Sequence, residues 1–238
     1  PALAAGDINS DGTEDLVIGG SSDYPARAFL QQKNGSFTQQ YLVSGSAGPE
    51  TFLDMGLLLF DADGDGDLDL YAARGGYEAA PHSAGYQDQF FRNDGKGHFT
   101  AVRGALPANF TSKSAVRSID YDKDGDLDLF VAGRVEPWHY PRPVSSFVFR
   151  NDSHQGAIRF TDVTSTVAPD LTGAGLVCDG LFTDFDNDGW QDMVIAGEWM
   201  PLTFLKNDRG KFRNVTGESG IGDKKGFWNS IAPGDFDN

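Results

Sequence analysis

The apolar positions of this chain fall in short runs rather than on helical faces. No segment sustains apolar residues at i, i+3, i+4 and i+7, the spacing of an amphipathic helix. Four nearly continuous apolar runs end instead at small residues: DLVIGG (15–20), DLDLYAARGG (67–76), DLDLFVAGR (126–134) and QDMVIAGEW (191–199). Continuous runs of this length are typical of strands that are buried on both faces. The pattern therefore predicts an all-β chain.

The same order of elements recurs around these runs. A short strand ending in an apolar residue and Asp comes first, as in GLLLFD (56–61), VRSID (116–120), GLFTD (180–184) and SIAPGD (230–235). A third strand leads into an Asn-containing turn, at RAFLQQKNG (27–35), QFFRNDGKG (89–97), FVFRND (147–152) and TFLKNDRG (203–210). A fourth strand carries a phenylalanine just past that turn: Phe37, Phe99, Phe160 and Phe212. Because Asn and Gly tolerate the positive φ of hairpin turns, we expect four antiparallel strands per repeat. We also expect the recurrent phenylalanines to pack between neighbouring repeats.

A nine-residue acidic loop joins the first and second strands of each repeat. The copies are DINSDGTED (7–15), DADGDGDLD (61–69), DYDKDGDLD (120–128) and DFDNDGWQD (184–192), and a fifth begins with DFDN (235–238). Side-chain oxygens occupy positions 1, 3, 5 and 9, glycine occupies position 6, and position 7 varies. This is how a calcium loop is built, since alternate side chains converge on the ion, glycine makes the turn and position 7 offers its backbone carbonyl.

The loops predict about four structural Ca²⁺ sites. The expected ligands are Asp7, Asn9, Asp11, Thr13, Asp15; Asp61, Asp63, Asp65, Asp67, Asp69; Asp120, Asp122, Asp124, Asp126, Asp128; and Asp184, Asp186, Asp188, Trp190, Asp192. A catalytic metal is disfavoured, because each ligand position is filled. Acidic turns without metal are the other alternative, in which clustered carboxylates would repel one another.

The loop starts lie 54, 59, 64 and 51 residues apart, a period typical of solenoids, propellers and arrays. Four antiparallel strands in such a period make one blade of a β-propeller. The chain is therefore expected to be a single β-propeller domain over 1–238, or part of one. It holds four blades and the start of a fifth.

The loop D-x-[DN]-x-D-G-x-x-D, followed by a β run and an Asn hairpin with Phe after it, resembles the FG-GAP/VCBS repeat family. This is the calcium-loop repeat of integrin α-subunit propellers and of many bacterial surface proteins. Segments 133–152, 184–201 and 226–238 are especially similar to large secreted bacterial members. The resemblance implies a ring of seven or eight blades with calcium in most of them. Four loops and a fragment cannot fill such a ring, so we expect either a ring completed by further residues or an open or assembled array.

Composition narrows the environment and the partners. A net charge of −16 argues against nucleic acid, which requires clustered Lys and Arg. The single cysteine, Cys178, excludes an intrachain disulfide and is expected to be a small core residue. No apolar run approaches membrane-spanning length. Loops of this kind suit the millimolar calcium outside cells, so we expect an extracellular, secreted or surface-attached protein. Because the sequence starts without methionine and stops inside a fifth acidic loop, we expect a mature or trimmed part of a longer chain.

Unusual residues follow the second strands, on the face expected to lie opposite the calcium loops. The candidate ligand-binding residues are Arg74, Tyr77, Arg134, Glu136, Trp138, His139, Tyr140, Glu198 and Trp199, accompanied by His82 and Arg142. Aromatic rings with charged hydrogen-bonding groups suit a glycan or a protein loop. The alternative is that these residues fill a central channel and pair with one another as Arg–Glu bridges.

The function expected from these features is a calcium-stabilised binding or adhesion scaffold. The chain lacks H-E-x-x-H, G-x-S-x-G and a phosphate-binding glycine loop, so no catalytic residue is assigned. A polysaccharide lyase stays open as an alternative, with His139 or Tyr140 as base and Arg134 or Arg142 neutralising a uronate. A structural spacer in a larger surface protein is the second alternative.

Overall fold

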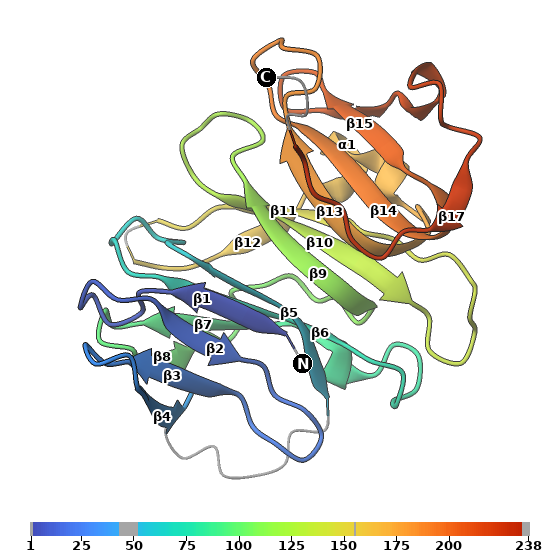
Figure 1. Cartoon of the computed structure of the whole chain (residues 1–238). Helices are drawn as coiled ribbons and strands as arrows, with labels where there is room; N and C mark the ends of the chain where they lie inside the picture. Colours follow the sequence, from blue (N-terminus) through green and yellow to red (C-terminus); the bar gives the residue numbers. More distant parts are fainter. Residues whose placement is uncertain (1, 43–51, 155, 235–238) are drawn as a thin grey trace.

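The computed structural model describes residues 2–42, 52–154 and 156–234 and contains four sequential antiparallel sheets (Figure 1). Sheet 1 consists of β1 (Leu3–Gly6), β2 (Asp15–Ile18), β3 (Arg27–Gln31) and β4 (Phe37–Tyr41). Sheet 2 consists of β5 (Leu53–Phe60), β6 (Asp69–Gly75), β7 (Gln89–Asn93) and β8 (Phe99–Ala101). In both, each strand pairs with the next one in sequence, so the predicted all-β class is confirmed.

The second half of the chain repeats this arrangement. Sheet 3 consists of β9 (Ser112–Ile119), β10 (Asp128–Val135), β11 (Phe147–Asn151) and β12 (Phe160–Asp162). Sheet 4 consists of β13 (Leu176–Thr183), β14 (Asp192–Pro201), β15 (Thr203–Asn207) and β16 (Phe212–Asn214). A further strand, β17 (Lys225–Phe227), pairs with the end of β14. This fifth strand was not expected from the sequence.

Helices in the described ranges are short. They are η1 (Ala84–Tyr86), α1 (Thr164–Val167), η2 (Pro169–Leu171) and η3 (Thr216–Glu218). The longest has four residues, so none of them could cross a bilayer.

Neighbouring sheets pack through apolar layers, and the first strands of successive sheets contact one another: β1 with β5, β5 with β9 and β9 with β13. The second strands β6, β10 and β14 are buried over most of their length, as their continuous apolar runs predicted. The same expectation is wrong for β2, where buried and accessible residues alternate and Ile18 is exposed. Phe99, Phe160 and Phe212 are buried in the three layers between sheets. The corresponding expectation is wrong for Phe37, which is 45% exposed because no described sheet covers that face of sheet 1.

Candidate metal loops and the opposite face

The acidic loops connect the first and second strands of all four sheets and share one internal hydrogen-bond pattern. The carboxylate at position 1 accepts from the glycine N–H at position 6, at 2.8 Å for Asp7 and Gly12 and at 3.2 Å for Asp120 and Gly125. The carboxylate at position 5 accepts from the N–H at position 7, as in Asp188 with Trp190 at 2.9 Å. These bonds fold each loop inward. The fifth loop, 235–238, lies outside the described residues.

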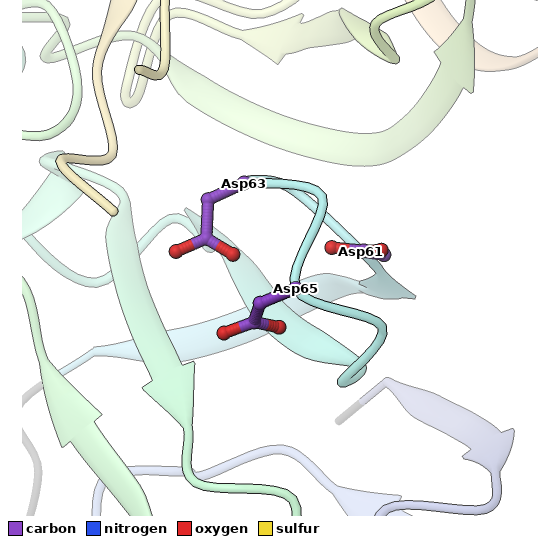
Figure 2. Close-up of side chains that lie close together, drawn as sticks. All are labelled: Asp61, Asp63 and Asp65. Atoms are coloured by element: carbon purple, nitrogen blue, oxygen red, sulfur yellow. The ribbon is translucent and has the colours of Figure 1, made fainter. Parts of the chain in front are cut away.

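The folding of the loops brings carboxylates together. In the part of the chain that the structure describes, three groups each have ligand oxygens within 4.8 Å of one another: Asp61, Asp63 and Asp65; Asp120, Asp122 and Asp128; and Asp184, Asp186 and Asp192. Figure 2 shows the first of these groups, with its three side chains projecting from a single turn of the chain. Loop 7–15 has Asn9 at position 3, where the other three loops have aspartate, so it contributes one carboxylate fewer than they do. No contact in the described residues tests the backbone carbonyls of Thr13, Asp67, Asp126 and Trp190 as ligands, and these stay predictions.

The position-9 carboxylate is the buried anchor of every loop. Asp15, Asp69, Asp128 and Asp192 are each fully or almost fully buried, and each accepts from the backbone N–H of the last residue of the third strand. Burial raises the pKa of Asp69 to about 6 and that of Asp128 to about 7, and nearby carboxylates contribute to both shifts. A divalent cation would remove this penalty by neutralising the charge.

Two further observations fit a bound cation. Within the described residues, Asp120 Oδ1 and Asp122 Oδ1 are buried without a hydrogen-bond partner, although buried carboxylate oxygens normally have one. In two other loops a positively charged side chain forms ion pairs with the carboxylates at positions 3 and 5. Arg92 Nη2 lies 3.1 Å from an oxygen of Asp63 and 3.1 Å from one of Asp65. Lys206 Nζ contacts Asp186 and lies 3.0 Å from Asp188. The loops are therefore chemically suited to a hard divalent cation with oxygen ligands.

The loop backbone adopts the left-handed conformation at two positions. At position 6 the glycines have φ between 87° and 98°. At position 4, Ser10, Lys123 and Asn187 have φ of 58°, 63° and 59°, and Gly64 has 75°. The sequence indicated the first requirement through its invariant glycine but not the second, since position 4 varies.

Replacement of Gly125 by Ala is expected to destabilise the protein by about 1–2 kcal/mol through backbone strain. A Cβ at Gly125 would meet no atom within 4 Å, so φ of 98° alone requires the glycine. Denaturant unfolding in calcium measures the effect. Ser10→Gly is the matched control and should be neutral or stabilising, because it relieves the same kind of strain. Equal stability of Gly125→Ala and the unsubstituted protein would contradict this account.

The β6–β7 and β10–β11 connections leave the second strands at the end away from the acidic loops, so they lie on the opposite face (Figure 1). There the structure brings four candidate residues together. Arg134 pairs with Glu198 Oε1, and Tyr140 donates its hydroxyl hydrogen to Glu198 Oε2 at 3.0 Å. Trp199 Nε1 donates to the same tyrosine oxygen at 2.7 Å. Phe227 packs edge-on against the Trp199 ring, with 4.5 Å between ring centroids. We call Tyr140, Trp199 and Phe227 the aromatic platform.

Other candidates lie beside a cavity of about 310 Å³ between the β6–β7 and β10–β11 connections. Glu136 lines it and pairs with Arg142 at 3.1 Å, with His82 Nε2 at 3.9 Å from its other oxygen. The Arg–Glu bridges expected as the alternative are thus present, at Arg134–Glu198 and Arg142–Glu136. They leave the aromatic rings exposed.

The remaining candidates have separate settings. Arg74 is largely buried and donates from Nη2 to Gln89 Oε1 at 2.8 Å. His139 Nδ1 lies 3.0 Å from the carbonyl oxygen of Pro137, and Tyr77 and Trp138 are exposed. Cys178 is a half-buried free thiol whose pKa is raised by burial.

Backbone strain is concentrated on this face as well. Outside the acidic loops and one hairpin turn, the described non-glycine residues with positive φ are His82 (60°), Trp138 (67°) and Trp199 (60°). Bulky side chains rarely adopt this conformation, and such outliers cluster at binding sites. Trp138 and Trp199 are also 58% and 54% exposed, respectively.

Four sequential antiparallel sheets, each with an acidic loop between its first two strands, define a β-repeat protein. The FG-GAP-like repeat model matches residues 7–72, 61–131 and 184–238, more than half of the chain. The chain therefore belongs to the FG-GAP-like repeat family, and the resemblance seen in the sequence is confirmed.

Similar proteins include cartilage acidic protein 1 of Xenopus tropicalis, 26% identical over 223 residues, and that of Mus musculus, 26% identical over 221 residues. Each alignment covers 89% of this chain and 31% of the relative, so the chain spans less than a third of the length of these relatives. The crystal structure of the V. cholerae biofilm matrix protein Bap1 aligns with a TM-score of 0.41 at 14% identity, covering 88% of this chain and 29% of that chain.

Proposed function

We propose that the protein is a calcium-stabilised extracellular binding scaffold in which each sheet is one blade of a β-propeller. Residues 1–238 would form one propeller domain or part of one, contributing four blades to a ring of seven or eight. The sequential strand order and the contacts between first strands support this arrangement.

The two ends of the stack also support a larger ring. At loop position 2, Ile8, Ala62 and Tyr121 are buried against the following sheet, whereas Phe185 of sheet 4 is 36% exposed. At the other end, Phe37 of sheet 1 is exposed although its counterparts are buried. Each exposed residue is the one that a further blade would cover.

Calcium is the proposed ion because the loops offer clustered carboxylates and a glycine turn, with oxygen ligands only. The role of the ion is structural. It would neutralise the buried position-9 carboxylates and hold the loop that joins the first and second strands. Sites of this class bind in the range that suits extracellular calcium, which is the basis for the proposed location.

The aromatic platform is the observation that carries the proposed binding role. Its tyrosine and tryptophan are oriented by the hydrogen-bond chain from Trp199 to Tyr140 to Glu198, yet Tyr140 and Trp199 remain 45% and 54% exposed. Aromatic faces held in place bind pyranose rings or protein side chains at low entropic cost. A glycan is the proposed ligand, with a protein loop as the other possibility. Trp138 and the cavity beside Glu136 extend the same face.

Trp199→Ala is expected to reduce glycan affinity at least tenfold, because an exposed aromatic anchor contributes about 1.4 kcal/mol or more to binding. A glycan and polysaccharide panel in millimolar calcium, repeated in chelator, measures this change. Tyr24→Ala is the matched control, since Tyr24 is also an exposed aromatic residue (69%) but lies in the β2–β3 connection of sheet 1 and is not part of the platform. Equal loss in both variants would contradict a role for the platform.

The same panel distinguishes the alternatives. Release of unsaturated sugar ends that is lost in His139→Ala or Arg134→Ala would identify a polysaccharide lyase. If the folded, calcium-loaded protein shows neither binding nor turnover, the spacer role is the alternative that remains.

A further inference from the structure

Each junction between sheets contains a buried asparagine in the same position. Asn93, Asn151 and Asn207 are the last residues of β7, β11 and β15, and each is at most 4% exposed. Asparagine is common in turns because it tolerates positive φ, but these three lie within strands. Their side chains therefore have another role.

Each of these side chains links two acidic loops. Asn93 Nδ2 donates to Ile8 O of the preceding loop at 2.8 Å and to Leu68 O of its own loop at 3.1 Å. Asn151 Nδ2 makes the same pair with Ala62 O and Leu127 O, at 2.9 and 3.2 Å. Asn207 Nδ2 repeats it with Tyr121 O and Gln191 O, at 2.9 and 3.1 Å.

The accepting carbonyls adjoin the proposed metal ligands. Position 2 of the preceding loop lies between the ligands at positions 1 and 3. Position 8 of the asparagine's own loop immediately precedes the buried position-9 carboxylate, which itself accepts from the asparagine N–H, at 2.7 Å for Asn207 and Asp192. One asparagine is therefore bonded beside the ligands of two consecutive loops.

A second contact joins the third and fourth loops. Lys123 Nζ, at position 4 of the third loop, lies 4.2 Å from the centroid of the Trp190 ring, at position 7 of the fourth. Sheet 1 differs from the others, because Gln31 occupies the equivalent of the asparagine and donates only its backbone N–H to Asp15, at 2.8 Å.

We propose that Asn93, Asn151 and Asn207 are positioning residues that couple metal binding between consecutive loops. An ion bound in one loop fixes the backbone carbonyl at position 2 of that loop. The fixed carbonyl orients the asparagine side chain, and the asparagine in turn holds positions 8 and 9 of the next loop in the geometry that binds the ion. The second ion then has less ordering to impose, so it binds more tightly. Direct repulsion between two cations would have the opposite sign.

This inference rests on the proposed calcium binding, and Trp190 allows the two to be tested separately. Terbium replaces calcium at oxygen sites, and its luminescence is sensitised by a nearby tryptophan, so Trp190 reports on the fourth loop. Trp190→Phe should abolish that signal and leave the site intact, since position 7 is expected to offer only its backbone carbonyl. This variant verifies the assignment against the other tryptophans.

The experiment is a terbium titration of the fourth loop with and without a functional third loop. Disabling the third loop with Asp120→Asn and Asp122→Asn is expected to weaken terbium binding at the fourth about fivefold or more. In Asn207→Gln, the same disabling should have no further effect. This substitution follows the natural Gln31 and retains the backbone donor, so the variant should fold, which circular dichroism verifies. Asn93→Gln, at the junction of the first two loops, is the matched control and should preserve the coupling.

The outcomes separate the two proposals. Absence of sensitised binding in the unsubstituted protein would overturn the proposed calcium binding itself. Binding at the fourth loop that is unchanged or strengthened when the third is disabled would overturn the coupling alone. Coupling that persists in Asn207→Gln would show that the asparagine does not carry it.

Discussion

Chelation of calcium is expected to lower the melting temperature of this protein by about 20 °C or more. A site with a Kd near 10⁻⁵ M in about 1 mM calcium stabilises the folded state by about 2.7 kcal/mol. Four such sites together contribute roughly 10 kcal/mol, comparable to the whole stability of a domain. For a chain of this size, each kcal/mol shifts the melting temperature by about 2–4 °C. Thermal unfolding in millimolar calcium and in chelator measures the shift.

Two controls make this result specific. Magnesium should restore little of the stability, because it requires a smaller, octahedral site. Asp122→Asn should remove about one site's share, whereas Asp208→Asn, an exposed carboxylate in the β15–β16 hairpin, should have almost no effect. A melting temperature that is the same with and without chelator would show that the loops do not depend on metal.

The repeating features of the fold were predictable because each is encoded locally. Alternate oxygens with a glycine at position 6 indicated the loop, and the apolar run after it indicated a buried strand. An asparagine at the end of the third strand recurs in sheets 2, 3 and 4, but the sequence pattern was interpreted as a turn former. Only the structure shows that Asn151 and its counterparts donate back to the preceding loop.

Features that depend on contacts between distant segments could not be predicted. Tyr140 and Trp199 were both expected on one face, but the hydrogen bond between them depends on how two sheets pack. Strand β17 pairs with the C-terminal end of β14 in sheet 4, and no repeating sequence pattern predicts this strand. The exposed Phe37 was interpreted by analogy with its counterparts, and the analogy fails where the described stack ends.

Lys113 shows the same limit, because it is a fully buried lysine on the first strand of sheet 3. Its ammonium group lies 3.1 Å from Asp88 Oδ1 and donates to Asn109 O at 2.8 Å and to Tyr86 O. Asp88 also accepts from the hydroxyl of Tyr71, at 2.5 Å. The network joins the β6–β7 connection of sheet 2 to sheet 3, on the side away from the acidic loops. Lysine is rarely buried, so nothing in the local sequence indicates this role.

Replacement of Lys113 by Met is expected to destabilise the protein by about 3–5 kcal/mol, because it leaves the Asp88 carboxylate buried without its cation. Adding Asp88→Asn should recover a large part of this loss, since the remaining amide needs no counter-charge. Lys224→Met, which breaks the exposed pair with Asp223, is the control and should change stability by at most about 0.5 kcal/mol. Denaturant unfolding in calcium measures all three variants.

The pH dependence of the Lys113→Met variant provides a second test of the same cause. Burial raises the pKa of Asp88, and Lys113 is the main group that opposes this rise. Without the lysine, the folded state favours the protonated form of Asp88. The folded protein therefore keeps its full stability below the unfolded pKa of this carboxyl and loses stability as the pH rises through the raised folded pKa. The deficit relative to the unsubstituted protein should therefore be smaller at mildly acidic than at neutral pH. A deficit independent of pH would mean that lost packing of the lysine stem, rather than an uncompensated charge, accounts for the destabilisation.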